Sequence, residues 1–183
     1  MVHRCVYGLP TTVRVAPRLE DGTPFPTVFW LTCPLARKHV GRLEAEGEMA
    51  ALSDRLQAET DFAEDYAGSH ERYVAFRDSL EAPLPGDPGA GGMPDYVKCL
   101  HVQLAHTLAT GDNPVGRWTC ERIAPMPCPG PCVEEELLER AYGPGGRPER
   151  VVGAPDEAAP PAERPNVADD RGAAEAGGTG GDE

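Results

Sequence analysis

The segment TTVRVAPRLEDGTPFPTVFWLT, residues 11–32, decides the fold of this chain. Residues 11–15 alternate in polarity and residues 27–32 are rich in β-branched and aromatic side chains, and both patterns are typical of strands. Between them, Asp21 and Gly22 supply hairpin turn chemistry, because glycine accepts positive φ and aspartate bonds to nearby backbone. The segment therefore predicts an antiparallel β-hairpin.

Helical patterns follow the hairpin along the chain. Pro34 suits a first helical turn and Gly47 a C-terminal cap, which predicts a helix between them. The spacing of apolar residues predicts further helices at about 49–57, 60–82 and 94–110, and a last short helix whose cap is Cys132. We expect an α+β fold, with one β-hairpin or small antiparallel sheet packed on four to five helices.

The composition changes near residue 143. Glycine, proline and alanine dominate residues 143–183, and acids outnumber bases there. Such a segment buries too little apolar surface to offset its ordering entropy, so we expect a disordered acidic C-terminal tail. Residues 1–142 are expected to form a single globular α+β domain.

The charge of the chain restricts its partners. The 183 residues carry a formal net charge of −13, which argues against binding to nucleic acid or to anionic lipid surfaces. The sequence has no apolar segment of signal-peptide or membrane-span type, so we expect a cytoplasmic protein. A protein partner is possible, and the oligomeric state is not predicted.

Six cysteines are the main chemical signal: Cys5, Cys33, Cys99, Cys120, Cys128 and Cys132. In a cytosolic protein they indicate metal binding, catalysis or simple burial rather than disulfides. Cys5 precedes the first strand of the hairpin and Cys33 follows the second. Because the ends of an antiparallel hairpin meet, both thiols are expected at its open end.

The predicted 94–110 helix carries a cysteine and two histidines. Cys99 and His106 share one side of it, while His101 lies at the edge of the opposite apolar stripe. One interpretation is that all three are core residues. The other is that Cys5, Cys33, Cys99 and either His101 or His106 form a tetrahedral zinc site, although Cys99 and His106 are roughly 10 Å apart along the axis. The sequence does not choose between the two histidines.

The later cysteines lie in the proline-rich segment WTCERIAPMPCPGPCV, residues 118–133. A bent, non-helical segment of this kind resembles a loose metal knuckle or an iron–sulfur loop. Cys132 is the candidate for an additional thiol. No CxxC pair occurs in the sequence, so the signal is weaker than that of a zinc ribbon.

A thiol-dependent enzyme is a further alternative. Cys99 near a helix N-terminus would have a lowered pKa, with a histidine as base. No orienting third residue, GxSxG, HExxH or phosphate-binding glycine loop is evident, so no catalytic residue is assigned. The segment DNPVG, residues 112–116, is predicted to be a turn.

Three blocks of sequence resemble a known family. APRLEDGTPFPTVFWLTCP at 16–34, GGMPDYVKCLHVQLAH at 91–106 and NPVG at 113–116 are similar, in this order, to a bacterial family catalogued as domain of unknown function 501. The resemblance covers about residues 3–125, and the family has no established activity. It implies, through gene neighbourhood, that cell-division or polyphosphate-related proteins are candidate partners.

The function predicted from sequence is therefore metal binding. The first hypothesis is a structural metal, zinc or less probably iron–sulfur, because a closed four-ligand set leaves no position for substrate. The alternatives are a metal-free adaptor that binds a cell-division or polyphosphate-related protein, and the thiol-dependent enzyme.

Overall fold

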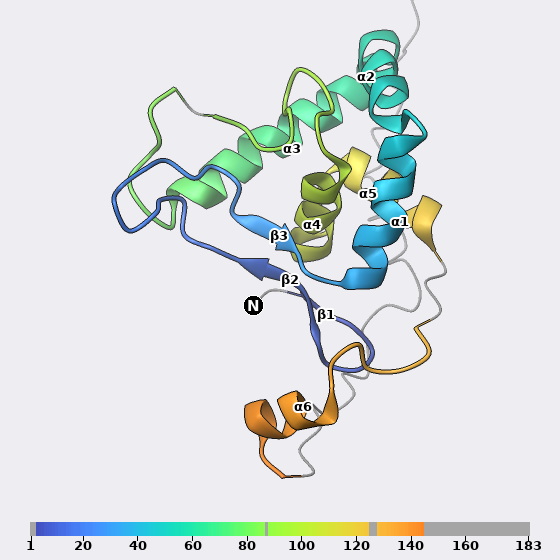
Figure 1. The fold of residues 1–183 in the computed structure, drawn as a ribbon. Coiled ribbons are helices and arrows are strands. Elements are labelled where there is room, and N and C mark those ends of the chain that lie inside the picture. The colour runs from blue at the N-terminus through green and yellow to red at the C-terminus, as the bar shows by residue number, and fades with distance from the viewer. Residues whose placement is uncertain (1–2, 87, 125–127, 145–183) are drawn as a thin grey trace, which may run out of the picture.

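The computed structural model describes residues 3–86, 88–124 and 128–144 (Figure 1). Its sheet has three antiparallel strands in the order β1-β2-β3: β1 (His3–Arg4), β2 (Pro10–Arg14) and β3 (Phe29–Leu31). Thr12 on the central strand pairs with His3 on one side and Leu31 on the other. The predicted pairing of the two hairpin strands is confirmed, and β1 extends it to a small sheet.

The connection between β2 and β3 turns at the predicted residues. Gly22 has a φ of 83°, and the amide of Thr23 donates to the Asp21 carboxylate over 2.9 Å. A bridge between Arg18 and Pro24 closes the turn. Gly22 and Asp21 therefore form the turn as predicted, one through its positive φ and the other through its bond to the nearby backbone.

Six helices occur in the described ranges: α1 (Pro34–Ala45), α2 (Glu48–Ala58), α3 (Thr60–Asp78), α4 (Leu100–Thr110), α5 (Pro114–Ile123) and α6 (Glu135–Tyr142). The α+β class is thus confirmed. α4 lies at the centre, between the sheet and the other helices, and contacts β3, α1 and α5 (Figure 1). α6 lies apart from the other helices, on the side of β1.

The core is built around α4. Leu100, Leu104 and Ala105 of this helix are fully buried, together with Val28 and Phe29 of the sheet side. Tyr73 of α3 joins them and uses its hydroxyl to accept the amide of Val28 and donate to the carbonyl of Pro26, each over 2.8 Å. Aromatic burial and satisfied polar groups together hold the sheet against the helices.

α4 begins later than the sequence predicted. Residues 94–99 are not helical, because Tyr96 and Lys98 donate their amides back to Gly92 and Gly91. Cys99 is the N-cap in an extended conformation, with φ −154° and ψ 115°. The expectation that Pro94 opens the helix was wrong, because these local turns take the backbone bonds that a helix would need.

α5 was not predicted as a helix, and Cys120 was placed in a non-helical segment. Asn113 caps α5 by accepting the amide of Gly116 over 2.9 Å, and Pro114 occupies the first turn. The turn prediction for residues 112–116 was therefore incomplete, because an Asn-Pro pair also begins helices. The cap of α6 is Glu134 rather than Cys132.

None of the helices in the described part of the chain is long and apolar enough to cross a membrane. The segment expected to be disordered lies outside the described residues from position 145 onward.

Candidate metal site

The predicted ligands lie in three separate places. Cys99 and His101 face Glu44 between α4 and α1, His106 is in the core, and Cys5, Cys33 and Cys132 are near the start of β2. Cys33 is the N-cap of α1 and Glu44 is in its last turn. Because a helix rises about 1.5 Å per residue, these two residues are about 16 Å apart along the axis. Cys33 and Cys99 therefore do not share an ion in this structure.

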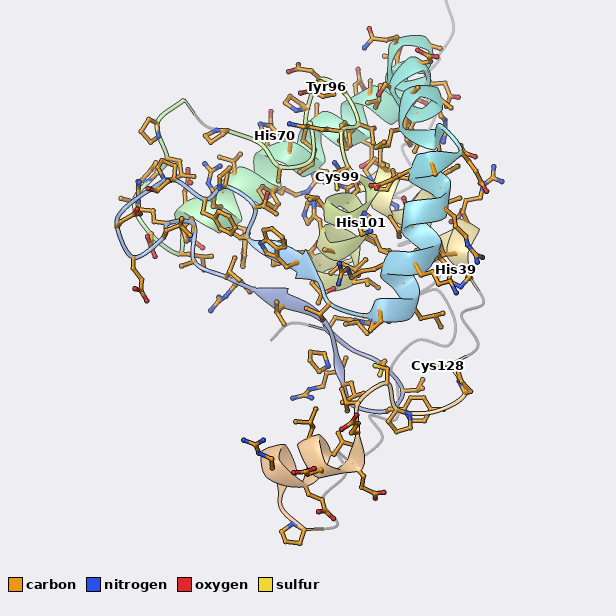
Figure 2. The ribbon with its side chains drawn as sticks, viewed as in Figure 1. His39, His70, Tyr96, Cys99, His101 and Cys128 are labelled. Atoms are coloured by element: carbon orange, nitrogen blue, oxygen red, sulfur yellow. The ribbon has the colours of Figure 1, made fainter. Side chains whose placement is uncertain are left out.

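Glu44, Cys99 and His101 form a compact cluster. One ligand atom from each, an oxygen, a sulfur and a nitrogen, lies within 4.8 Å of the other two. All three residues are partly buried, and Figure 2 shows Cys99 and His101 at the start of α4. An O/S/N set of this kind matches the ligands that zinc takes in proteins.

The backbone of Cys99 explains why it lies beside His101. If both residues were helical, their side chains would point about 160° apart by the helix rule. Cys99 is extended instead, so the rule does not apply to it. The later start of α4 therefore brings together two side chains that the sequence analysis had placed on different sides.

Glu44 anchors the cluster from α1. Its Oε1 accepts the amide of Leu100 over 2.7 Å and lies 3.1 Å from His101 Nδ1. The carboxylate thus sits at the positive end of the α4 dipole. Glu44 could not be predicted from the sequence, because 57 residues separate it from His101 and no local spacing relates them.

Both ring nitrogens of His101 face oxygen acceptors. Nδ1 lies 3.1 Å from the Glu44 carboxylate, and Nε2 lies 3.2 Å from the carbonyl of Arg37. A neutral imidazole has one N–H and one lone pair, so it can donate to only one of these oxygens. One of the two oxygens is therefore left without a donor from the ring unless Nδ1 also carries a proton or binds a cation.

Cys99 is not activated as a nucleophile. Burial raises the pKa of its thiol, the amides of Val102 and His101 act in the opposite direction, and the Glu44 carboxylate raises it further. A thiol with a raised pKa is a weak nucleophile at neutral pH, which disfavours the thiol-enzyme alternative. A metal ion would remove this proton, because a coordinated thiol is deprotonated.

His106 belongs to the core and not to this cluster. Its ring stacks on Phe29, with centroids 5.8 Å apart, and meets Tyr73 edge to face. The side-chain amide of Asn113 lies 3.2 Å from His106 Nδ1. Burial lowers the pKa of His106 to about 4, so the ring is neutral. The structure thus separates the two histidines that the sequence could not distinguish.

The fold and the cluster define an α+β protein in which a Glu/Cys/His set joins the end of one helix to the start of another. The family described as "Protein of unknown function (DUF501)" matches residues 1–121, and the chain belongs to this family. The match includes Glu44, Cys99 and His101 and ends before Cys128. Comparisons with curated proteins and with solved structures gave no match.

Proposed function

We propose that this protein binds a zinc ion through Glu44, Cys99 and His101. The observation that carries the proposal is the pair of oxygen acceptors at His101, which a cation at Nδ1 would satisfy while Nε2–H donates to the Arg37 carbonyl. Metal-bound histidines commonly donate their second nitrogen to a backbone carbonyl in this way.

The number of ligands distinguishes this site from a closed structural one. Three protein ligands leave the fourth tetrahedral position of zinc for water or a small molecule. His101 and Glu44 have side chains that are 30% and 21% exposed, so the position is accessible from solvent. The proposed ion would thus be available to a ligand, unlike the four-ligand site expected from the sequence.

The same residues have a simpler role without a metal. Glu44 would cap α4 and form an ion pair with a protonated His101, at 3.1 Å. The two roles differ in what a substitution does. A Glu44→Gln variant keeps an oxygen that can accept the amide of Leu100, but it loses the charged ligand.

The test is elemental analysis of the full chain, purified without a metal-affinity tag. Cys99→Ala, His101→Gln and Glu44→Gln are each expected to hold about one zinc ion fewer per chain than the parent. His39→Gln is the matched control, because His39 is a histidine of α1 that lies on the side away from the cluster (Figure 2). It should keep the zinc content of the parent.

A melting experiment complements the zinc measurements, and one result would contradict the proposal. Zinc added to the metal-free parent should raise its melting temperature, because an ion that binds only the native state stabilises it, and the three variants should show a smaller increase than the parent. Equal zinc content in the parent and all three variants would contradict the proposal. That result would leave Glu44 and His101 with the metal-free capping role described above.

A further inference from the structure

Cys5 and Cys33 lie on either side of the start of β2. The amide of Cys5 donates to the carbonyl of Leu9 over 2.9 Å, and the amide of Cys33 donates to the carbonyl of Thr11 over 3.4 Å. These bonds fix both cysteines next to the first residues of the central strand. This is the open end of the hairpin, where the sequence placed them.

A segment from the other end of the described chain comes to the same place. The hydroxyl of Tyr7 donates to the carbonyl of Cys128 over 2.9 Å, across 121 positions of sequence. Figure 2 shows Cys128 beside the turn between β1 and β2. Cys132 follows in the same loop. Partial burial of its thiol and the neighbouring thiols of Cys33, Cys128 and Cys5 raise the pKa of Cys132.

The geometry points to a second, structural zinc site, formed by Cys5, Cys33, Cys128 and Cys132. It is separate from the Glu44 cluster, which lies at the other end of α1. Four cysteines form a closed tetrahedral set, so this ion would have no open position and would fasten the 128–144 segment to the N-terminal turn.

The local structure suits thiolate ligands. Cys33 is the N-cap of α1, and its sulfur accepts the amide of Ala36 over 3.5 Å. A helix N-terminus stabilises a thiolate, and a bond from the backbone orients it. Cys128 and Cys132 have C-x3-C spacing across Pro129, Gly130 and Pro131. That spacing is within the range of structural zinc motifs.

The charge of the four thiolates favours a cation bound between them. The negative charges of neighbouring thiolates repel one another, and a dication bound between them offsets this repulsion. All six cysteines have free thiols, and Cys132 is exposed while Cys5, Cys33 and Cys128 are half-buried. Of the four, only Cys33 packs against the hydrophobic core, so burial in the core, the ordinary explanation for free cysteines, does not account for the other three.

Binding requires the four sulfurs to move closer together than they lie in this structure. In the described residues the ligand atoms of Glu44, Cys99 and His101 form the only set of three within 4.8 Å. Four Zn–S bonds of about 2.3 Å place the sulfurs about 3.8 Å apart. The thiol of Cys128 now donates to the carbonyl of Gly130 over 3.1 Å, and this bond would be given up when the thiol loses its proton.

The test is cobalt substitution of the full chain under anaerobic, reducing conditions. Sulfur-to-cobalt charge-transfer absorption increases with the number of thiolate ligands, so the four-cysteine site should dominate the spectrum. Cys128→Ser and Cys132→Ser should each remove most of this absorption and lower the zinc content by about one ion per chain. Neither residue is in the hydrophobic core, so both variants should fold.

Cys120→Ser is the matched control, because Cys120 is a half-buried thiol of α5 outside both sets. It should keep the spectrum and the zinc content of the parent. Hydrogen exchange supplies a second readout. Zinc should protect the amides of residues 128–144 in the parent and in Cys120→Ser, but not in Cys132→Ser.

Three outcomes would overturn the inference. These are a spectrum unchanged in Cys128→Ser and Cys132→Ser, a disulfide among the four cysteines in protein purified anaerobically, and iron with sulfide in place of zinc. Loss of zinc from Cys99→Ala alone, with these two variants unaffected, would overturn this site and retain the Glu44 site.

Discussion

Cys33 and Glu44 stand at opposite ends of α1, one as its N-cap and the other in its last turn. A single helix therefore contributes a residue to each of the two proposed zinc sites. Sites separated by more than about 10 Å and without shared partners usually behave additively. A Cys99→Ala/Cys132→Ser double variant should thus lose about two zinc ions per chain, and each single variant about one. Elemental analysis of the three variants checks this, and loss of both ions from one single variant would contradict it.

The neutral state of His106 predicts a pH dependence of stability. Burial holds its pKa at about 4, against 6.5 in an exposed residue, and of its charged neighbours Asp112 raises this pKa while Arg72 lowers it. Because the unfolded chain takes up the proton first, stability is complete above about pH 6.5 and falls as the pH decreases toward 4, by up to about 3 kcal/mol.

Urea denaturation of the parent and of His106→Gln between pH 4.5 and 7 checks this prediction. The variant should be less stable at pH 7, because it loses the stacking on Phe29, but its stability should depend less on pH. Parallel curves for the two proteins would show that another group titrates. The zinc content of His106→Gln should equal that of the parent.

Gly116 controls the approach of α5 to α4. A Cβ at this position would lie 2.2 Å from the carbonyl oxygen of Gln103 and 2.1 Å from Thr107 Oγ1. The backbone of α4 cannot move aside cheaply, so Gly116→Ala should destabilise the protein by about 1–3 kcal/mol.

Gly41 is the control for that substitution. It lies within α1 and a Cβ there would meet no atom within 4 Å. Gly41→Ala should stabilise the protein by about 0.5–1 kcal/mol, because alanine favours the helix. Thermal melts of both variants check the pair, and a destabilised Gly41→Ala or a neutral Gly116→Ala would show that the packing is different.

Asn113 holds three elements at the start of α5. Its side chain accepts the amide of Gly116 and donates to Gln103 Oε1, and it is fully buried. Asn113→Ala should cost at least about 2 kcal/mol, from the lost cap and the unsatisfied buried partners. Its φ of 80° also favours glycine over alanine. Asn113→Gly should therefore lower the free energy of unfolding less than Asn113→Ala does, as measured by urea denaturation. The reverse order would contradict this account.

The sequence predicted the elements whose signals are local. The hairpin was predicted because strand alternation and the Asp21–Gly22 turn lie within one short segment. α1 and α2 were predicted by apolar spacing and by Pro34 and Gly47, close to their observed bounds. α4 was predicted with a start that was too early, because the local bonds from Tyr96 and Lys98 to the carbonyls of Gly92 and Gly91 are not visible in hydrophobic periodicity.

The candidate sites were less predictable than the fold. Cys99 and His101 were named from sequence, but Glu44 was not, since only the packing of α1 on α4 brings it to them. The sequence placed Cys5 and Cys33 together correctly at the open end of the hairpin. It also grouped them with Cys99, which in the structure lies beside Glu44 at the other end of α1, a separation that no local pattern in the sequence reveals.

The Tyr7–Cys128 bond has a consequence for the order of folding during synthesis. The hairpin and α1 leave the ribosome first, because the chain is made from its N-terminus. The hydrogen bond of Tyr7 can form only after Cys128 has been translated, 121 positions later. The first two thiols would therefore remain without their partners through most of translation. Completion of the cluster would mark the moment at which the newly made chain has reached Cys132.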